Sequence, residues 1–365
     1  MTNSKDLLKK SIKGIAEYVP GKSTEDIVAG YGLRPEDIVK LGSNENPLGP
    51  STRAVEAVRT MADSISVYPS VDAGELRRAL AAYVGYPEDM VVMGAGMDGV
   101  VDTLMRLFVQ PGTSAIIPTP TFSYFEIALR AAGGTPVFVK RQDDYSVPIK
   151  TIISSIEDST RLIYLCSPNN PSGNTIPEDD VRALVKSTNA IVFLDEAYVE
   201  FASKSLVGLV SEYDNLVVGR TMSKAMGLAG LRIGYAVVPN WIFREYMKAT
   251  TPFAISRIAV AAGLAALDDV DYREKTIDNV DVGRKFLTEH LSGYCRVYQS
   301  EGNFILIDVS PKKSKDVVEM LLKKGIIVRD CTSFRDAGDG LVRITVGTPD
   351  QNKLVVDALQ GTLGS

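Results

Sequence analysis

The sequence has few residues of the types on which many active sites depend: one histidine and three cysteines among 365 residues. A histidine-based zinc site needs two or three imidazoles, and a Ser–His–Asp triad needs one beside its nucleophile. His290 lies in a polar, helical stretch, Lys285–His290, which is typical of the exposed face of a helix. We therefore expect neither kind of site, and we assign His290 no role.

The sequence also lacks a cysteine framework, a long apolar run and a basic stretch. Cys166, Cys295 and Cys331 are odd in number and far apart, as expected of reduced thiols in a cytoplasmic protein. No window approaches about 18 consecutive apolar residues, so we expect no membrane span. A net charge of −5 without basic runs argues against binding to nucleic acid or to an anionic membrane.

What is present is an alternation of short apolar runs and amphipathic stretches between about residues 88 and 240. Nearly all-apolar strands separated by helices are typical of a mostly parallel sheet that is covered on both faces. The sequence thus predicts an α/β fold with a large, mostly parallel sheet flanked by helices. The predicted strands are 90–93, 114–117, 136–139, 161–165, 190–194, 215–218 and 234–238.

The pattern changes in the C-terminal part, where a helix-rich stretch leads into a smaller α+β unit. We expect an N-terminal arm (1–45) that joins the small domain, a large domain (46–260) and a small C-terminal domain (261–365). In the small domain the predicted strands are 304–309, 326–329 and 341–346, and the predicted helices are 314–324 and 349–363.

A glycine-rich motif follows the first predicted strand of the sheet. Gly94, Gly96 and Gly99 match the dinucleotide fingerprint G-x-G-x-x-G, which suggests an NAD-dependent dehydrogenase. Such a site needs an acidic residue at the end of the next strand, and the segment Ile117–Pro120 has none. The dinucleotide hypothesis is therefore disfavoured. The loop can still hold a single phosphate at a helix N-terminus, or it can simply form a tight turn.

Three polar segments follow other predicted strands, at the edge where ligands of open α/β sheets bind. Asn170 lies in the turn Ser167–Gly173, Asp195 directly follows a buried strand, and Lys224 and Arg232 share a glycine-bearing loop. Each residue alone is equally well explained as a turn cap, an ion pair or a solvated side chain. An aldehyde cofactor with a phosphate and a pyridine nitrogen, however, needs a lysine, a phosphate cradle and a carboxylate, and together the segments supply all three.

These segments, with others along nearly the whole chain, resemble the pyridoxal-phosphate-dependent aminotransferases with the aspartate aminotransferase fold (fold type I), and among them the histidinol-phosphate aminotransferases. The order and spacing of the motifs carry the resemblance. The matching segments are 18–22, 41–50, 68–69, 167–173, 195–198, 223–234, 325–330 and 342–347. The resemblance implies that residues 46–260 bind pyridoxal 5′-phosphate.

The resemblance also implies roles for residues around the cofactor ring. Lys224 would form the Schiff base and then move the substrate proton, for which its pKa must be lowered. Asp195 would face the pyridine nitrogen and keep it protonated. Tyr198 and Asn170 would donate to the phenolic oxygen, and Phe122 would stack on the ring.

Further residues would hold the cofactor phosphate. By resemblance these are Ser223, Arg232 and the loop at Met97 and Asp98. Arginine suits this place because its planar fork pairs with two phosphate oxygens. Tyr68 would reach the phosphate in the neighbouring subunit, so the resemblance implies a homodimer with two sites at one interface.

The substrate's anionic group would bind at the small domain. The resemblance places Arg343 at this anion, with Arg329, Tyr18 and Asn170 close by. Two arginines that converge on one anion suit a phosphate better than a carboxylate, although either can bind. Arg329 could instead pair with a neighbouring acidic side chain.

The expected reaction exchanges an amino group between L-histidinol phosphate and 2-oxoglutarate, giving imidazole-acetol phosphate and L-glutamate in histidine biosynthesis. The partners are thus small molecules, an amino phosphate and a 2-oxo acid. Two alternatives share the fold: an aminotransferase for aromatic amino acids and a threonine-phosphate decarboxylase. A regulator that binds the cofactor without catalysis is disfavoured, because no helix-turn-helix pattern or basic stripe precedes the core.

Overall fold

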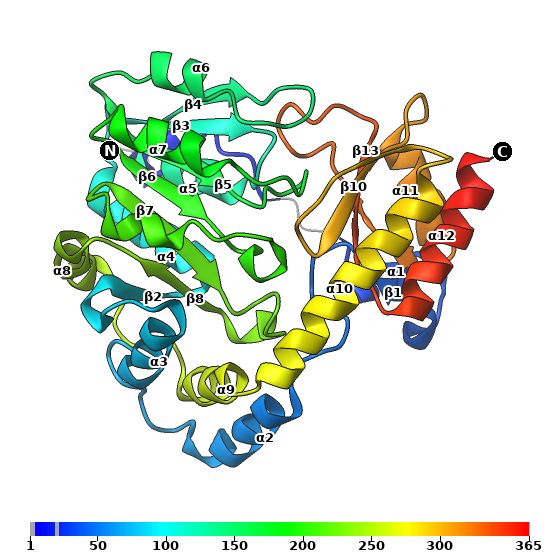
Figure 1. The fold of residues 1–365 in the computed structure, drawn as a ribbon, viewed down its shortest axis with the longest axis horizontal. Helices are drawn as coiled ribbons and strands as arrows, with labels where there is room; N and C mark the ends of the chain where they lie inside the picture. The colour runs from blue at the N-terminus through cyan, green and yellow to red at the C-terminus, as the bar shows by residue number, and fades with distance from the viewer. Residues whose placement is uncertain (1–3, 19–21, 365) are drawn as a thin grey trace.

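The computed structural model describes residues 4–18 and 22–364, and its larger part is built on a seven-stranded sheet (Figure 1). The strand order is β2-β8-β7-β6-β5-β3-β4. Within the described residues, β8 runs in the direction opposite to that of the other strands of this sheet. The strands are β2 (Val91–Ala95), β3 (Ser114–Thr119), β4 (Thr135–Lys140), β5 (Thr160–Cys166), β6 (Ile191–Asp195), β7 (Leu216–Thr221) and β8 (Ile233–Val237). The predicted α/β fold is confirmed, and each strand overlaps one of the predicted strands.

Helices cover both faces of this sheet and bury two separate apolar cores. Leu80 and Leu184 belong to the core on one face, and Leu104 and Tyr246 belong to the core on the other. Because both faces are covered, the central strands are apolar throughout, and this made them recognisable in the sequence. The helices over the first core are α3 (Gly74–Val84), α6 (Ile149–Ser154), α7 (Glu178–Lys186) and α9 (Arg257–Leu267), and α2 (Thr52–Met61) packs against α9. The helices over the second core are α4 (Gly96–Phe108), α5 (Tyr124–Ala132) and α8 (Asn240–Ala249).

A smaller part with its own apolar core lies beside the large sheet (Figure 1). The long helix α10 (Val270–Leu291) connects the two, since its Val280 packs in a core of the large sheet and its Leu287 in the core of the smaller part. A four-stranded antiparallel sheet has the order β12-β13-β10-β9. Its elements are β9 (Arg296–Tyr298), β10 (Phe304–Asp308), β12 (Arg329–Asp330) and β13 (Leu341–Thr345), with α11 (Ser314–Leu322) and α12 (Pro349–Leu363).

The prediction of one strand over 326–329 is wrong, because two short strands in different sheets occupy this segment. β11 (Ile326–Ile327) pairs in parallel with β1 (Val39–Lys40), whereas β12 pairs with β13. The apolar run correctly indicates extended chain. The run could not show that a strand of the N-terminal segment, β1, pairs with the first half of 326–329.

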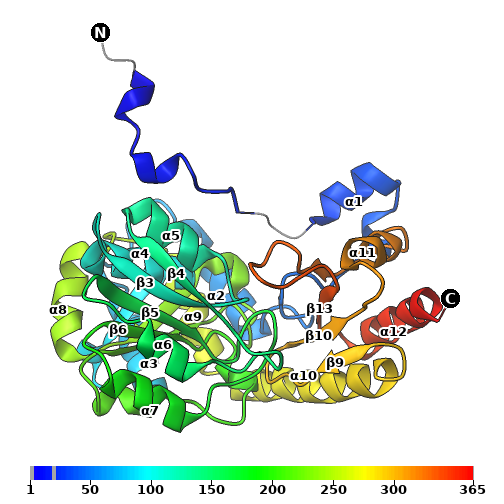
Figure 2. The same ribbon diagram turned by 90° about the horizontal axis from the view of Figure 1, so that it is seen from above.

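The N-terminal segment begins with two short 3₁₀ helices, η1 (Ser4–Leu7) and η2 (Lys10–Ile12), and η2 contacts α5 (Figure 2). Helix α1 (Thr24–Tyr31) follows and starts at a capping box between Ser23 and Asp26, which satisfies two backbone donors of its first turn. Among the helices of residues 4–18 and 22–364, none combines the length and the apolar character that crossing a bilayer requires.

Candidate active site

The glycine motif brings the first turn of α4 against the guanidinium of Arg232. Gly96 has φ +75°, and a Cβ there would lie 2.4 Å from Arg232 Nη2. A Cβ on Gly234 in the neighbouring strand would lie 2.2 Å from the carbonyl carbon of Gly96. Only glycine therefore permits this close approach of strand, helix and arginine. The motif thus forms a compact turn, which we call the cradle, and both the single-phosphate and the tight-turn interpretations allow it.

The cradle gathers hydroxyl, amide and guanidinium donors at the ends of β7 and β2. Arg232 Nη2 donates to Asp98 Oδ2 at 2.7 Å. Ser223 N donates to Thr221 Oγ1 at 3.1 Å, and that hydroxyl donates to Ser223 Oγ at 2.9 Å. Burial raises the pKa of Asp98, while the charge of Arg232 opposes the rise. Since Met97 also lines this end, the structure brings the four predicted phosphate residues together.

Asp195 ends β6 and places a buried carboxylate at the floor of the cavity. Its side chain accepts from the backbone N–H of Ala197 and from the hydroxyl of Tyr164, both at 3.0 Å. The residue is only 5 % exposed, and this burial raises the pKa of the carboxyl group to about 6, against the opposing effect of both donors. A carboxylate held in this way is stabilised by a cationic partner.

Tyr198 and Asn170 present donors to the middle of the cavity. The Tyr198 hydroxyl accepts from Asn44 Nδ2 at 3.0 Å, so its own proton is available to a ligand. Arg343 Nη1 donates to Asn170 Oδ1, which turns the amide nitrogen of Asn170 away from the arginine. Both predicted donors to the phenolic oxygen therefore line one cavity.

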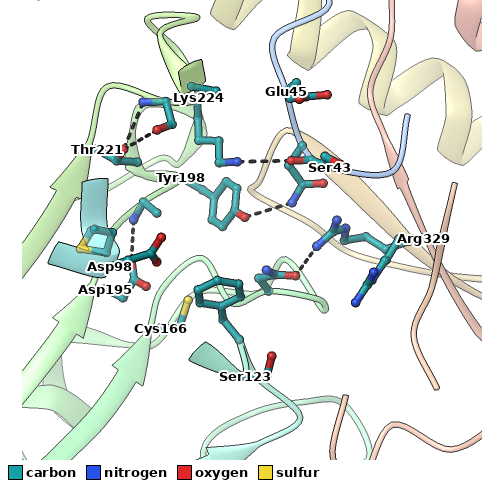
Figure 3. Close-up of a pocket in the computed structure, with 18 of the residues that line it drawn as sticks. Ser43, Glu45, Asp98, Ser123, Cys166, Asp195, Tyr198, Thr221, Lys224 and Arg329 are labelled. Carbon is teal, nitrogen blue, oxygen red and sulfur yellow. Dashed lines mark hydrogen bonds between the residues drawn. The ribbon is translucent and has the colours of Figure 1, made fainter. Parts of the chain in front are cut away.

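Lys224 extends into the same cavity, with its amine directed toward Ser43 (Figure 3). Its ammonium donates to the backbone oxygen of Ser43 at 3.3 Å and lies 5.7 Å from the centre of the Tyr198 ring. Burial, followed by the positive charge of Arg343, lowers the pKa of Lys224 to about 8, although Glu45 acts against this. About a tenth of the amine is therefore neutral and nucleophilic at pH 7, far more than for an ordinary lysine.

Arg343 is a buried cation at the opposite end of the cavity. It is 5 % exposed, donates to Asn170 and to the backbone oxygen of Gly42, and makes no ion pair with a carboxylate of the described residues. Its Nε has no hydrogen-bond partner there either. Burial lowers the pKa of Arg343. A desolvated guanidinium without a carboxylate is a binding group for an anion.

The remaining predicted substrate residues border the same end. Arg329 donates to Ser333 Oγ at 3.0 Å and lies over the ring of Phe334, 5.5 Å from its centre. The rings of Tyr18 and Phe122 meet edge to face at 6.3 Å. All of these residues except Ser333 line the cavity with Lys224.

Tyr68 lies outside the cavity of its own chain. The side chain is 77 % exposed and packs on Phe253, with the ring centres 5.1 Å apart. Ile65, Val67 and Val71 beside it are also exposed apolar residues. Its proposed contact with the cofactor thus needs a second copy of the chain.

Together these groups enclose a cavity of about 420 Å³ at the carboxyl ends of β5, β6 and β7. Figure 3 shows Lys224 and Tyr198 between the Asp98 and Asp195 side and the Arg329 side. The lining residues are Tyr18, Gly42, Ser43, Asn44, Glu45, Met97, Asp98, Phe122, Ser123, Cys166, Asn170, Asp195, Ala197, Tyr198, Thr221, Ser223, Lys224, Ala229, Gly230, Arg232, Arg329, Phe334 and Arg343.

Sequence reasoning missed several of these contacts. Asn44, with φ +53°, binds Tyr198 and accepts from Thr345 Oγ1 at 3.1 Å, whereas the sequence pattern placed it only in the matching segment 41–50 and gave it no role. Tyr164 was hidden in an apolar strand, although a tyrosine fully buried in such a strand usually needs a partner for its hydroxyl. His290 lies exposed in the last turn of α10, outside the cavity, as expected.

We predict that the cofactor-free protein captures an aldehyde cofactor faster as the pH rises through about 8, because the neutral Lys224 amine is the reactive form. Arg343→Gln removes a cation that lowers the pKa of Lys224, so the midpoint should move to higher pH. Glu45→Gln removes an anion with the opposite effect and should move it lower. Stopped-flow absorbance over a pH series measures these midpoints, and identical midpoints in all three proteins would contradict the assignment.

The family model for "Aminotransferase class I and II" matches residues 36–359. The chain therefore belongs to the class I and II aminotransferases, the class of protein that its fold and cavity define. Members of this family use pyridoxal phosphate.

Within this class, the chain is similar to histidinol-phosphate aminotransferases. The histidinol-phosphate aminotransferase of Methanosarcina mazei is 53 % identical over 357 residues, covering 98 % of this chain and 96 % of its own. That of Methanothermobacter thermautotrophicus is 40 % identical over 359 residues, covering 96 % of each chain. The crystal structure of a histidinol-phosphate aminotransferase from Sinorhizobium meliloti in complex with pyridoxal-5′-phosphate matches with TM-score 0.88, 26 % identity, and coverage of 98 % of this chain and 97 % of that one.

Proposed function

We propose that this protein is a histidinol-phosphate transaminase that uses pyridoxal 5′-phosphate. It exchanges the amino group of L-histidinol phosphate with 2-oxoglutarate to give imidazole-acetol phosphate and L-glutamate, a step of histidine biosynthesis. The observation that carries the proposal is one cavity that holds both the partly buried Lys224 amine and the buried Arg343 guanidinium, which pairs with no carboxylate of the described residues. The unpaired cysteines of the described chain support a cytoplasmic location.

The chemistry of the donors fits the cofactor at each of its functional groups. The cradle of Ser223, Arg232 and the first turn of α4 suits its phosphate. The buried carboxylate of Asp195 suits a protonated pyridine nitrogen, and Tyr198 and Asn170 suit its phenolic oxygen. When bound, pyridoxal phosphate supplies an aldehyde that reacts with amines and a ring that accepts electrons.

Lys224 is the group that moves the proton. Its Nζ, once free, takes the proton from the substrate carbon that carries the amino group and holds it for return. The lowered pKa of Lys224 suits this work, because an efficient general base has a pKa near the working pH. Ser43 O accepts from Nζ at 3.3 Å and restricts where the amine points.

Asp195 stabilises the positive charge on the cofactor ring nitrogen. The hydroxyl of Tyr164 and the N–H of Ala197 hold the carboxylate in one orientation. In this buried setting an ion pair is strong only when such hydrogen bonds fix its geometry.

Substrate selection falls to Arg343, with Arg329 and Tyr18 at the same end of the cavity. Charge-assisted hydrogen bonds to a phosphate contribute about 1.5–3 kcal/mol each. L-Histidinol has the same amino group and imidazole but no phosphate, so it separates this contribution from the rest of the substrate.

The test measures both substrates with 2-oxoglutarate. We expect kcat/KM for L-histidinol phosphate to exceed that for L-histidinol by about 10²-fold or more, with imidazole-acetol phosphate and glutamate formed one to one. Arg343→Gln should shrink this ratio, whereas Arg296→Gln, at an arginine stacked on Tyr298, should leave it unchanged. Equal kcat/KM values for the two substrates in the wild type would refute the proposal.

We further propose that the enzyme is a homodimer in which Tyr68 acts on the partner's cofactor. The exposed apolar residues Ile65, Val67, Tyr68, Val71 and Phe253 support an interface on this side of the molecule. A patch of this kind on a two-fold axis would bring each Tyr68 to the other subunit.

A mixture of two impaired variants tests this arrangement. In a heterodimer of Tyr68→Ala and Lys224→Ala, one site has Lys224 from the first chain and Tyr68 from the second, and is intact. Random reassociation of equal amounts should therefore restore about a quarter of wild-type activity. Activity no higher than that of the separate variants would show that Tyr68 does not act across the interface.

A further inference from the structure

A second buried arginine, Arg141, lies behind the cavity and takes no part in the reaction described above. It follows β4 and is 3 % exposed. Its Nη1 donates to the backbone oxygen of Tyr145 at 3.1 Å, and its Nη2 donates to Asn169 Oδ1 at 3.0 Å. Within residues 4–18 and 22–364 it forms no ion pair with a carboxylate, and its Nε has no hydrogen-bond partner.

Asn169 uses both ends of its amide to tie neighbouring loops together. It is 0 % exposed, and its Oδ1 accepts from Arg141 and, at 2.8 Å, from Thr121 Oγ1. Its Nδ2 donates to Ser172 Oγ at 2.7 Å and to the backbone oxygen of Pro120 at 3.1 Å. A buried amide with two donors and two acceptors in place has one well-defined orientation.

The loops joined in this way carry two of the cavity's side chains. Phe122 follows Thr121 directly, and Asn170 follows Asn169. Both line the cavity with Lys224, whereas Arg141 and Asn169 are behind it. A shift of Asn169 would thus move Phe122, which would stack on the cofactor ring, and Asn170, which would donate to its phenolic oxygen, together.

The chemistry of Arg141 argues for a role beyond filling space. A guanidinium buried without a carboxylate costs free energy, and apolar residues of similar volume would pack here at lower cost. Although burial lowers its pKa to about 10, the side chain keeps its charge at neutral pH. The charge strengthens its hydrogen bond to Asn169 and so makes the orientation of that amide hard to change.

We propose that Arg141 is a positioning residue of the active site, which through Asn169 fixes Asn170 and Phe122 in the places where they hold the cofactor ring. The proposal rests on the proposed function for the identity of the cofactor. It predicts effects on cofactor binding that do not depend on which amino donor the enzyme prefers.

The experiment uses Arg141→Met and Arg141→Lys in the full chain, with Arg77→Met as the matched control. Arg77 is also a buried arginine with an unpartnered Nε, but it lies on α3 and does not line the cavity. Three quantities are measured: the melting temperature without cofactor, the Kd for pyridoxal phosphate, and the pH midpoint of the absorption change of the bound cofactor.

We expect Arg141→Met to raise the Kd at least about fivefold and to move the absorption midpoint to higher pH. The direction follows because Asn170 would donate less well to the anionic phenolic oxygen. Arg141→Lys should recover part of both effects. Arg77→Met should lower the melting temperature but leave the Kd and the midpoint within about twofold of wild type.

Thr121→Val provides a second test if Arg141→Met does not fold, because it removes only one donor to Asn169. It should raise the Kd and move the midpoint in the same direction by a smaller amount. A Kd and midpoint equal to wild type in a folded variant of Arg141 or in Thr121→Val would overturn the proposal. Failure of the wild type to bind pyridoxal phosphate would instead overturn the proposed function.

Discussion

Lys224→Ala is expected to lower kcat for transamination by at least about 10³-fold. In the proposed function the variant lacks both the amine that would attach the cofactor and the base that would move the proton, and proton transfer alone contributes about 10²- to 10⁴-fold. Borohydride should fix the cofactor covalently to the wild type at the peptide that contains Lys224. The same treatment should leave Lys224→Ala unlabelled, as mass spectrometry of the digested proteins would show.

Two comparisons separate chemistry from damage to the fold in this variant. Lys285→Ala, at an exposed lysine of α10, should keep wild-type kcat and labelling. A small primary amine added to Lys224→Ala should restore part of the rate, because it can take up the proton in place of Nζ. Turnover of Lys224→Ala at the wild-type rate would show that another residue performs the proton transfer.

Asp195→Asn is expected to have the second-largest effect, a loss of about 30- to 5,000-fold in kcat/KM. The substitution keeps the shape of the side chain but removes the charge that, in the proposed function, faces the ring nitrogen. Loss of one partner from a buried charge pair costs about 2–5 kcal/mol, which sets this range. Steady-state kinetics at saturating cofactor measure it. An activity within about threefold of wild type would mean that Asp195 does not face the ring nitrogen.

The stability of the cofactor-free protein offers an independent check on Asp195, because there Asp195→Asn should be favourable, whereas it should lower the activity. Burial raises the pKa of this carboxyl from 3.8 to about 6, so the folded protein retains a proton that the unfolded chain has lost. The free energy of unfolding should therefore fall as the pH rises from about 4 to about 6, by about 2 kcal/mol from this group. Asp195→Asn lacks this loss, and without cofactor it should gain stability relative to wild type across that interval. Denaturant unfolding at pH 4 and pH 7 measures the difference.

The sequence was most informative where one physical requirement acts on consecutive residues. Strands such as Ile191–Asp195 are buried on both faces, so an apolar run that ends in a carboxylate marks both the strand and the site. Glycine at positions 94, 96 and 99 likewise showed that a helix begins against the sheet. The glycine pattern by itself fits a dinucleotide or a single phosphate, and it could not show that Arg232 packs over Gly96.

Contacts between distant segments were beyond the reach of the sequence pattern. Asn44 contacts Tyr198 because β1 pairs with β11, and this pairing places the residues that follow β1 at the cavity. Arg141 looks like an ordinary surface arginine after a strand, and only the folded loops show it buried against Asn169. Such contacts depend on the tertiary packing of loops, which no local spacing of residue types encodes.

The most direct test of the account compares kcat/KM of the wild-type enzyme for L-histidinol phosphate, phenylalanine and threonine phosphate, each with 2-oxoglutarate as acceptor. The buried Arg343, which pairs with no carboxylate of the described residues, and Arg329 predict a preference of at least about tenfold for histidinol phosphate over phenylalanine. The proposed function further predicts at least about a tenfold preference over threonine phosphate, which carries the same phosphate, with no carbon dioxide released from it. A preference of tenfold or more for phenylalanine, or decarboxylation of threonine phosphate, would contradict it.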